Sequence, residues 1–439
     1  MRKTIVVCWL LTLIFLAPDG FALPEEPASG TGEAVATEPA DSGPAIARRE
    51  SFDVEEATRS YLDRLLPEEK ERSDRYFVGG YWLQLWGLIY SLAVAAFLLY
   101  GGVANRMRNF AERLFRKAWL QTAAFGAQYI LLTTLLFFPL TVYQDFFREH
   151  HYGLATQAFG EWFGEQLMAL AVDLVLVSIL IVVLYAVMRR APRTWWVWGA
   201  GVFVVFLAII ILIAPVYIDP LFNTYVPLED PAVRDPILSM ARANGVPADE
   251  VLQFDASRQT TRISANVSGF AGTMAIRLND NLLNRCSQAE IEAVMAHELG
   301  HYALNHVYEI LIEFGIVLIV GFAFLKWASD RALARWGERW QIRGPADVAS
   351  LPLFVALFAI YFFVATPFTN TIIRTNESEA DIFSLNTSRE PDAFAEVALK
   401  VSDYRKLEPT PLEEWIFFDH PSGKSRIRMA MQWKAEHLE

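Results

Sequence analysis

Two histidines in the second half of the chain, His297 and His301, are four residues apart, with Glu298 directly after the first. Residues at this spacing lie on one face of an α-helix, so both imidazoles can bind the same metal ion. Ser287 and Glu290 form a capping box that opens such a helix. In metallopeptidases this pattern holds Zn²⁺, and the glutamate takes a proton from the water that the metal activates. The pattern predicts a zinc-dependent hydrolase with Glu298 as its general base.

A catalytic zinc ion has three protein ligands and leaves its fourth position to water. A polar segment at 374–381 offers carboxylates for the third ligand, because Glu377 and Asp381 share a helical face at a spacing of four residues. We expect one Zn²⁺ per chain, held by the two histidines and Glu377, with Asp381 fixing the orientation of a zinc histidine. Spacing alone leaves Glu379 as a rival ligand, and it leaves open a histidine pair that binds no metal.

Long apolar stretches surround these residues. Hydrophobic residues make up 54% of the 439 positions, and the mean hydropathy of +0.25 is too high for an ordinary soluble enzyme. A helix of about 20 residues crosses a bilayer core of roughly 30 Å. The chain has six candidate spans, at 76–103, 119–142, 166–188, 195–216, 310–325 and 351–368. The fifth is short, and we expect it to continue a helix that begins before residue 310.

The N-terminus has the features of an export signal. A basic start precedes an apolar core, and small residues suited to cleavage follow, so 1–22 is either a signal peptide or an uncleaved signal anchor. The next stretch, 23–50, is rich in Pro, Ala, Gly and acidic residues, which predicts a disordered linker. We expect a membrane domain of four spans at 51–218 and a zinc peptidase domain at 219–439, which includes the last two spans.

Basic residues concentrate in three of the loops between the spans, at 106–117, 189–193 and 326–343. Short loops rich in Lys and Arg stay on the cytoplasmic side of a membrane. The polar block at 219–309 and the tail after 370 then lie on the opposite side. We expect a multi-pass protein of a bacterial inner membrane, with its zinc site on the periplasmic side.

Charge and cysteine content exclude other classes of protein. The formal net charge of -12 argues against nucleic acid as a partner, because phosphate binding needs clustered basic residues. Cys8 lies in the leader, so Cys286 has no disulfide partner in an exported chain. The expected partners are the lipid bilayer and a peptide or protein substrate that is unfolded or tethered to the membrane.

The chain resembles the type I CAAX prenyl protease family, the integral-membrane zinc peptidases related to bacterial heat-shock membrane proteases. The likeness extends from about residue 52 to the C-terminus and rests on an ordered set of motifs. In that family the glutamate that opens E-x-x-A-D is the third ligand, so the resemblance implies Glu377 rather than Glu379, with Asp381 behind a ligand. The motifs are Tyr61-Leu62-Asp63, Asp219-Pro220-Leu221-Phe222, Pro227-Leu228-Glu229-Asp230, Ser264-Ala265-Asn266, His297 to His301 with His306, Glu377 to Asp381, and His420-Pro421 with Arg426.

The resemblance also implies roles for residues whose spacing alone proves nothing. It places His420 and Arg426 near the zinc ion, where an imidazole or guanidinium stabilises the oxyanion of the tetrahedral intermediate, and Arg374 is a further candidate. The segment 262–278 alternates like a short hairpin, and one of its strands could offer an open edge to an extended substrate. Asn266 would hold a substrate carbonyl there, unless its side chain only satisfies the hairpin itself.

These observations predict a mainly α-helical, polytopic membrane protein with a small α+β zinc peptidase domain of the gluzincin type. The first expected function is quality control of envelope proteins by an endopeptidase. Processing of prenylated or lipidated C-terminal peptides is the second, although eukaryotic family members act from the cytosolic side, opposite to the side that the basic loops indicate here. An inactive zinc-binding scaffold is the third.

Overall fold

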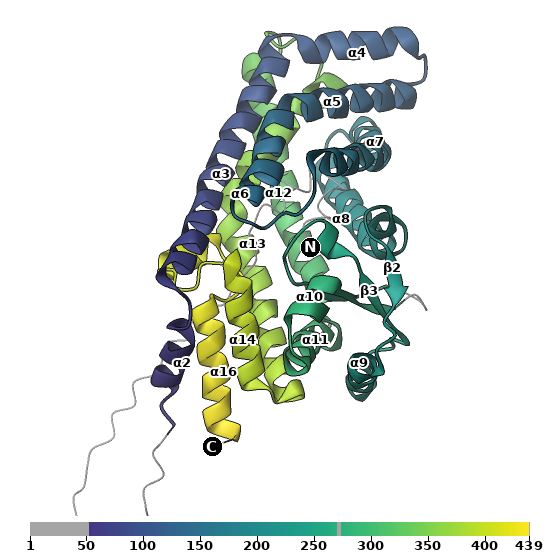
Figure 1. Ribbon diagram of the computed structural model, residues 1–439. Coiled ribbons are helices and arrows are strands. Elements are labelled where there is room, and N and C mark those ends of the chain that lie inside the picture. Colours follow the sequence, from purple (N-terminus) through teal and green to yellow (C-terminus); the bar gives the residue numbers. More distant parts are fainter. Residues whose placement is uncertain (1–51, 270–273, 439) are drawn as a thin grey trace, which may run out of the picture.

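The computed structural model describes residues 52–269 and 274–438, so the predicted leader at 1–22 and the linker at 23–50 lie outside the described residues. Within the described residues, six helices are long and apolar enough to cross a membrane, as predicted. They are built on α3 (Pro67–Tyr100), α5 (Ala118–Thr141), α7 (Phe159–Arg190), α8 (Trp195–Ile213), α12 (His306–Trp336) and α13 (Leu351–Ser388). Figure 1 shows them in the upper part of the molecule, with the later turns of α13 continuing down beside α14 (Pro391–Lys400).

These helices extend beyond the predicted apolar runs. A π-helical turn at Val142–Phe147 joins α5 to α6 (Arg148–His151), and a second one at Ala214–Ile218 extends α8. The sixth span is longer than the predicted run at 351–368, because α13 continues without a break to Ser388 and includes the polar segment at 374–381. The prediction counted apolar residues only, whereas the backbone hydrogen bonds of a helix need no interruption where the chain leaves the bilayer.

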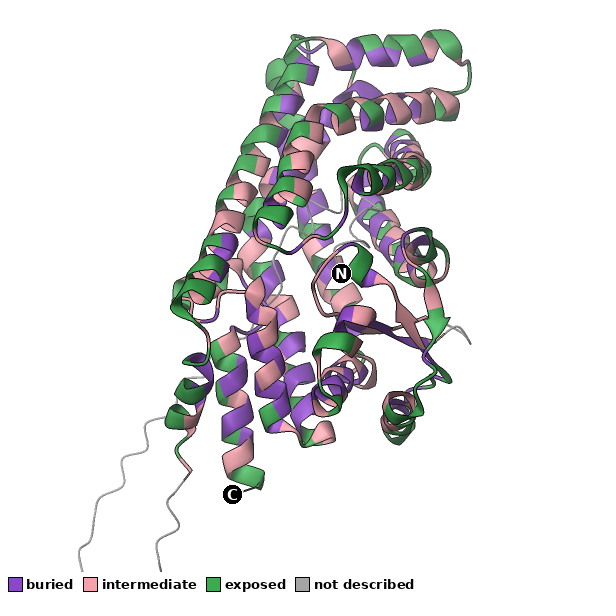
Figure 2. Ribbon diagram, viewed as in Figure 1, coloured by how far each residue is buried: buried purple, intermediate pink, exposed green. Residues whose placement is uncertain are grey.

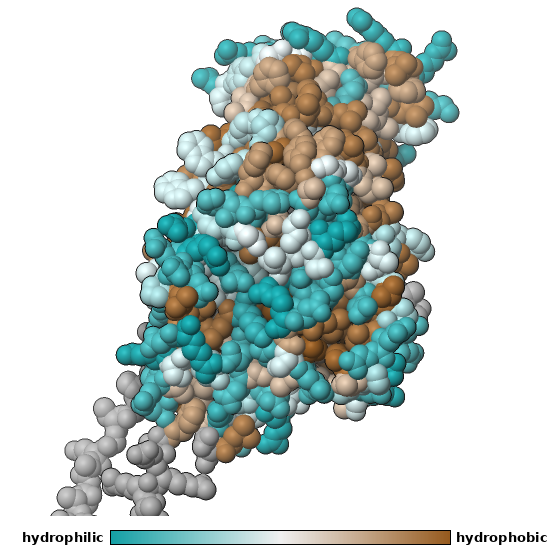
Figure 3. All heavy atoms as spheres, in the orientation of Figure 1, coloured by the Kyte–Doolittle hydropathy of each residue, from teal (hydrophilic) through white to brown (hydrophobic). Residues whose placement is uncertain are grey.

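The outward faces of the long helices are apolar. Trp82, Leu135, Val205, Ile316 and Val364 each expose more than half of their surface. Figure 3 shows a hydrophobic band over the upper half of the molecule, with hydrophilic surface below it and at the far upper end. An apolar surface of this extent is typical of lipid contact, because monomeric soluble proteins rarely leave one open to water.

The helix α13 is the interior helix of the set. Within its most apolar stretch 67% of the residues are buried, against 28% in each of the other five membrane-length helices of the described chain. Figure 2 shows that buried residues also dominate α14 below it, whereas α3 and α4 carry many exposed ones. The remaining helices are α2 (Val54–Leu62), α4 (Val103–Leu114), α9 (Pro231–Ala243), α10 (Asp280–Arg285), α11 (Gln288–Ala303), α14 (Pro391–Lys400), α15 (Pro411–Phe417) and α16 (Gly423–His437).

A small mixed sheet lies in the polar half. Its strand order is β2 (Tyr225–Pro227), β3 (Glu250–Phe254), β5 (Ala275–Asn279) and β4 (Ala265–Ser268). β3 and β5 are parallel, and the other two pairs are antiparallel. The predicted hairpin within 262–278 is confirmed, because β4 and β5 pair as antiparallel neighbours and β4 forms one edge of the sheet.

The predicted histidine helix is α11, which lies between the sheet and α13. Ile291, Met295 and Leu299 belong to one apolar cluster with the buried strand residues Ile276 and Leu278. These helix residues recur every four positions, so α11 buries one continuous apolar stripe against the sheet. Its polar side chains project from the other faces of the helix.

The three basic loops lie at one end of the molecule. Arg108 of α4 pairs with Asp347 of the α12–α13 connection at 2.6 Å, and both side chains are buried. Arg189, at the end of α7, donates a hydrogen bond to Thr122 Oγ1 of α5. Figure 1 shows α4 at the opposite end from α11, α14 and α16. The fold therefore separates the basic loops from the polar half that carries the sequence-predicted site.

Candidate metal centre

The candidate site forms where α11 and α13 pack together. Ser287 caps α11 through Glu290 N, and the Glu290 carboxylate accepts a hydrogen bond from Ser287 N, as the capping box predicted. Ser384 of α13 donates a hydrogen bond to the carbonyl oxygen of Ala293 at 2.7 Å. The contact between the helices places the histidine-bearing face of α11 opposite the carboxylates of α13.

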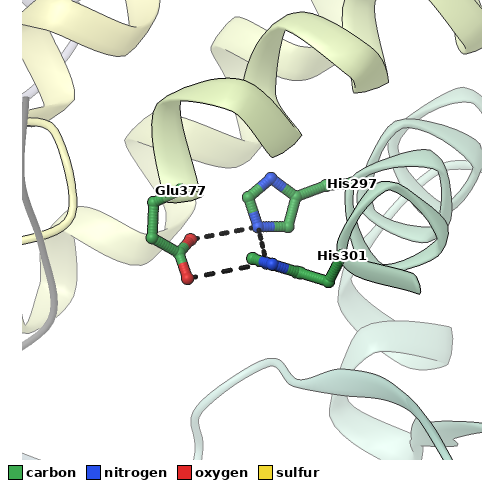
Figure 4. Close-up of side chains that lie close together, drawn as sticks. All are labelled: His297, His301 and Glu377. Carbon is green, nitrogen blue, oxygen red and sulfur yellow. Dashed lines mark hydrogen bonds and ion pairs between the residues drawn. The ribbon is translucent and has the colours of Figure 1, made fainter. Parts of the chain in front are cut away.

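Two imidazoles and one carboxylate meet at this contact, and Figure 4 shows both rings facing Glu377. His297 Nε2 lies 3.1 Å from Glu377 Oε2, and His301 Nε2 lies 3.5 Å from Glu377 Oε1. The two Nε2 atoms are 3.1 Å apart. Four ligands at about 2.0–2.1 Å from a tetrahedral ion are themselves separated by roughly 3.3 Å. The spacing of these three donor atoms therefore fits a single divalent ion, and His297, His301 and Glu377 are the residues that would hold it.

The carboxylate predicted to orient a ligand lies behind His297. His297 Nδ1 is 2.8 Å from Asp381 Oδ1, and Asp381 is fully buried. Arg426 donates two hydrogen bonds to the same carboxylate, from Nε at 2.9 Å and from Nη2 at 2.5 Å. This pairing favours a positioning role for Arg426, in place of the oxyanion role that the resemblance implies.

The electrostatics of α11 suit its chemistry. Burial lowers the pKa of His301 to about 4, so its imidazole is neutral and can offer a lone pair. Burial also raises the pKa of Glu298 to about 7, and the nearby Glu377 carboxylate adds to that increase. A general base works best when its pKa is close to the working pH.

His420 lies within the site, as the resemblance implies. Its Nε2 atom is 3.2 Å from Glu377 Oε2, and its Nδ1 atom is 3.5 Å from Asp419 Oδ1. The buried Arg374 donates a hydrogen bond to the carbonyl oxygen of Glu414 at 2.5 Å, so it supports the segment that leads to His420.

Asn266 lies on the edge strand β4, where its side chain has a partner within the strand. Its Oδ1 atom accepts a hydrogen bond from Ser268 Oγ at 2.6 Å. This contact matches the alternative interpretation of Asn266, in which its side chain forms a hydrogen bond within the hairpin. The amide NH₂ group can still donate to another acceptor.

Sequence reasoning did not assign roles to the residues behind His301. His306 Nδ1 is 2.9 Å from His301 Nδ1, and Glu379 Oε2 is 3.2 Å from His306 Nε2. Glu379, the rival third ligand, therefore lies against His306 and not between the two α11 imidazoles. The sequence signals these contacts only through a third histidine that closely follows the pair. It does not show that the turn at Asn305 brings His306 back against His301.

Comparisons with known proteins show the family and the fold of the chain. A family model described as CAAX prenyl protease N-terminal, five membrane helices, matches residues 54–224, and the model of Peptidase family M48 matches residues 227–434. Within 54–224 the structure has four membrane-length helices. The crystal structure of S. mikatae Ste24p superposes with a TM-score of 0.68 at 20% identity, covering 86% of this chain and 95% of that one, which shows a shared fold.

Relatives in sequence come from bacteria and eukaryotes. The chain is 29% identical over 335 residues to the "Uncharacterized metalloprotease YhfN" of Bacillus subtilis, covering 76% of this chain and 78% of that protein. It is 24% identical over 379 residues to CAAX prenyl protease 1 of Saccharomyces cerevisiae, covering 77% and 83% respectively. With both family models matched in order along most of its length, the chain belongs to the CAAX prenyl protease family of M48 membrane metallopeptidases.

Proposed function

We propose that this chain is a zinc-dependent endopeptidase that degrades unfolded or membrane-tethered proteins at the outer face of a bacterial inner membrane. The observation that carries the proposal is the convergence of His297, His301 and Glu377, whose donor atoms are 3.1 to 3.5 Å apart, beside the catalytic candidate Glu298. This set has the ligand types and spacing of a catalytic zinc site with one position left for water.

When bound, Zn²⁺ would polarise a peptide carbonyl and lower the pKa of water. Glu298 would accept the proton of the attacking water and deliver it to the leaving amine. His420, with Nε2 at the edge of the ligand set, would donate a hydrogen bond to the oxyanion. The edge strand β4, which carries Asn266, would hold an extended substrate through main-chain hydrogen bonds.

The direct test is hydrolysis of unfolded casein by the full chain in detergent. We expect a chelator to stop cleavage and added zinc to restore it. Replacing Glu298 with Gln should abolish cleavage while the protein still binds zinc, because the amide cannot take a proton. Glu292→Gln is the matched control, since Glu292 lies on the same helix and accepts an exposed hydrogen bond from Gln288. Normal turnover by the Glu298→Gln protein would contradict the proposed mechanism.

Processing of lipidated C-terminal peptides is the second candidate, and the names of several relatives favour it. The chain is similar to a Saccharomyces cerevisiae protein described as CAAX prenyl protease 1 and to an Arabidopsis thaliana protein described as a CAAX prenyl protease 1 homolog. Parallel assays with casein, a farnesylated CAAX peptide and the same peptide without its lipid separate the two functions. Quality control predicts cleavage of casein without dependence on the lipid, and processing predicts the reverse. A scaffold would cleave none of the three.

The proposed side of the membrane rests on the basic loops, which lie at the end of the fold away from α11. We expect a reporter that is active only in the cytoplasm to be inactive when fused after residue 439, and a reporter that needs export to be active at the same position. The same two reporters fused within 106–117 serve as the control and should give the opposite result. Cytoplasmic activity at the C-terminus would overturn the periplasmic assignment.

A further inference from the structure

The third histidine, His306, lies directly behind the proposed ligand His301. A turn through Asn305, whose φ of 64° is in the left-handed region, ends α11 and starts α12 at His306. The turn folds His306 back so that its ring centre is 5.1 Å from that of His301. The His306 side chain is only 1% exposed, so it is confined to this position.

The contacts determine which ring atoms carry protons. His301 Nε2 faces His297 and Glu377, so Nε2 is its ligand atom and the proton of the neutral ring is on Nδ1. The Nδ1–H group then donates to His306 Nδ1, 2.9 Å away. An accepting Nδ1 puts the proton of His306 on Nε2, which donates to Glu379 Oε2 at 3.2 Å. Every polar atom in this chain of contacts has a compatible partner.

The two proposed imidazole ligands are therefore supported in parallel ways. His297 reaches a carboxylate directly, through Asp381. His301 reaches Glu379 through the ring of His306. A hydrogen bond from the outer nitrogen fixes the tautomer and orientation of a ligand histidine and increases its basicity.

A second cation site is the rival interpretation, since donor atoms of His306, Glu309 and Glu379 lie within 4.8 Å of one another. Such a site needs a lone pair on His306 Nε2, which moves the proton to Nδ1. That proton would face the Nδ1–H group of His301 across 2.9 Å, so two donors would oppose each other. The geometry disfavours this site for as long as His301 is itself a ligand.

We propose that His306 and Glu379 are positioning residues, which hold the ligand His301 in its metal-binding tautomer through a relay of two hydrogen bonds. The inference rests on the proposed zinc site. It adds that zinc affinity depends on a pair of residues that do not touch the ion.

The test compares two variants of nearly equal shape in a Glu298→Gln background, where zinc affinity is measured by chelator competition without any need for hydrolysis. His306→Leu has no acceptor and should weaken zinc binding by roughly 10- to 100-fold. His306→Asn keeps an oxygen near the position of Nδ1 and should recover most of the affinity. His437→Leu, at an exposed position on α16, is the control and should bind zinc like the parent.

A surface variant and the metal content complete the test. Glu379→Gln replaces a half-exposed carboxylate by a neutral acceptor, so we expect a smaller, few-fold loss of affinity and no loss of fold. Each protein should bind one zinc ion. Unchanged affinity in His306→Leu, or a fall from two ions to one, would overturn the relay and leave the proposed function standing. A parent protein that binds no zinc would overturn the proposed function as well.

Discussion

At the scale of single residues, acidic side chains that lie close together in the sequence have different partners in the site. Three acidic side chains lie within two turns of α13, yet only Glu377 faces both imidazoles of α11, while Asp381 and Glu379 lie behind them. The sequence predicted the pairing of Glu377 with the histidines and the place of Asp381. It could not predict the contact of Glu379 with His306 or that of Arg426 with Asp381, because each joins side chains distant in the chain.

The pKa of Glu298, raised to about 7 chiefly by burial, predicts the pH dependence of hydrolysis. The base must be deprotonated, so activity should fall as the pH drops through this pKa. A bound Zn²⁺ lowers the pKa of a neighbouring carboxyl group, and we therefore expect the acidic limb of kcat/KM at or below about pH 7. A rate profile of casein cleavage measures it. A profile without any acidic limb would remove Glu298 as the titrating base.

At the scale of elements, the spacing between α11 and α13 depends on one glycine. A Cβ atom on Gly300 would lie 3.0 Å from Cδ1 and 3.2 Å from Cβ of Phe383, which is closer than side chains normally pack. The glycine of the His-Glu-Leu-Gly-His motif thus allows the close helix contact that unites the ligands. A motif shows that such a glycine is present, but the partner that requires it becomes visible only when the helices are assembled.

We expect Gly300→Ala to weaken zinc binding several-fold and to lower the melting temperature. Alanine favours a helix by about 1 kcal/mol over glycine. Overpacking against Phe383 costs about 1–3 kcal/mol and pushes α11 away from α13. Gly164→Ala in α7 is the matched control, because nothing lies within 4 Å of its added Cβ. Thermal unfolding and chelator competition measure both effects. Wild-type zinc affinity and melting temperature in Gly300→Ala would show that the close contact with Phe383 determines neither of them.

At the scale of the whole molecule, a largely buried polar network ties α3 and α6 to the segment before the edge strand β4. Glu149 of α6 accepts hydrogen bonds from Tyr76 of α3 at 2.7 Å and from Arg262, just before β4, at 2.6 Å. Arg262 also donates to the Tyr76 hydroxyl at 2.9 Å. The apolar and polar patterns of the sequence predict a membrane domain and a peptidase domain, but neither pattern indicates which charged residues form this network.

Glu149→Ala should destabilise the junction strongly. The substitution leaves Arg262, whose side chain is 19% exposed, without its carboxylate; removal of one partner from a fully buried ion pair costs about 3–5 kcal/mol, and we expect a cost somewhat below that range here. We expect a clearly lower melting temperature in detergent. Glu71→Ala is the control, because the pair that Glu71 makes with Arg75 is largely exposed and should contribute little. Equal melting temperatures for the two variants would contradict a structural role for the network.

The unbroken course of α13 has a mechanical consequence. The helix has 38 residues and is about 57 Å long at 1.5 Å per residue; it begins at the end that carries the basic loops and, about 39 Å along its length, bears the carboxylate that faces the α11 imidazoles. A helix of this kind responds to a thinner or thicker bilayer by tilting. A tilt of α13 relative to α11 would move Glu377 against His297 and His301, so we expect the geometry of the proposed site to respond to the lipid chain length of the host membrane.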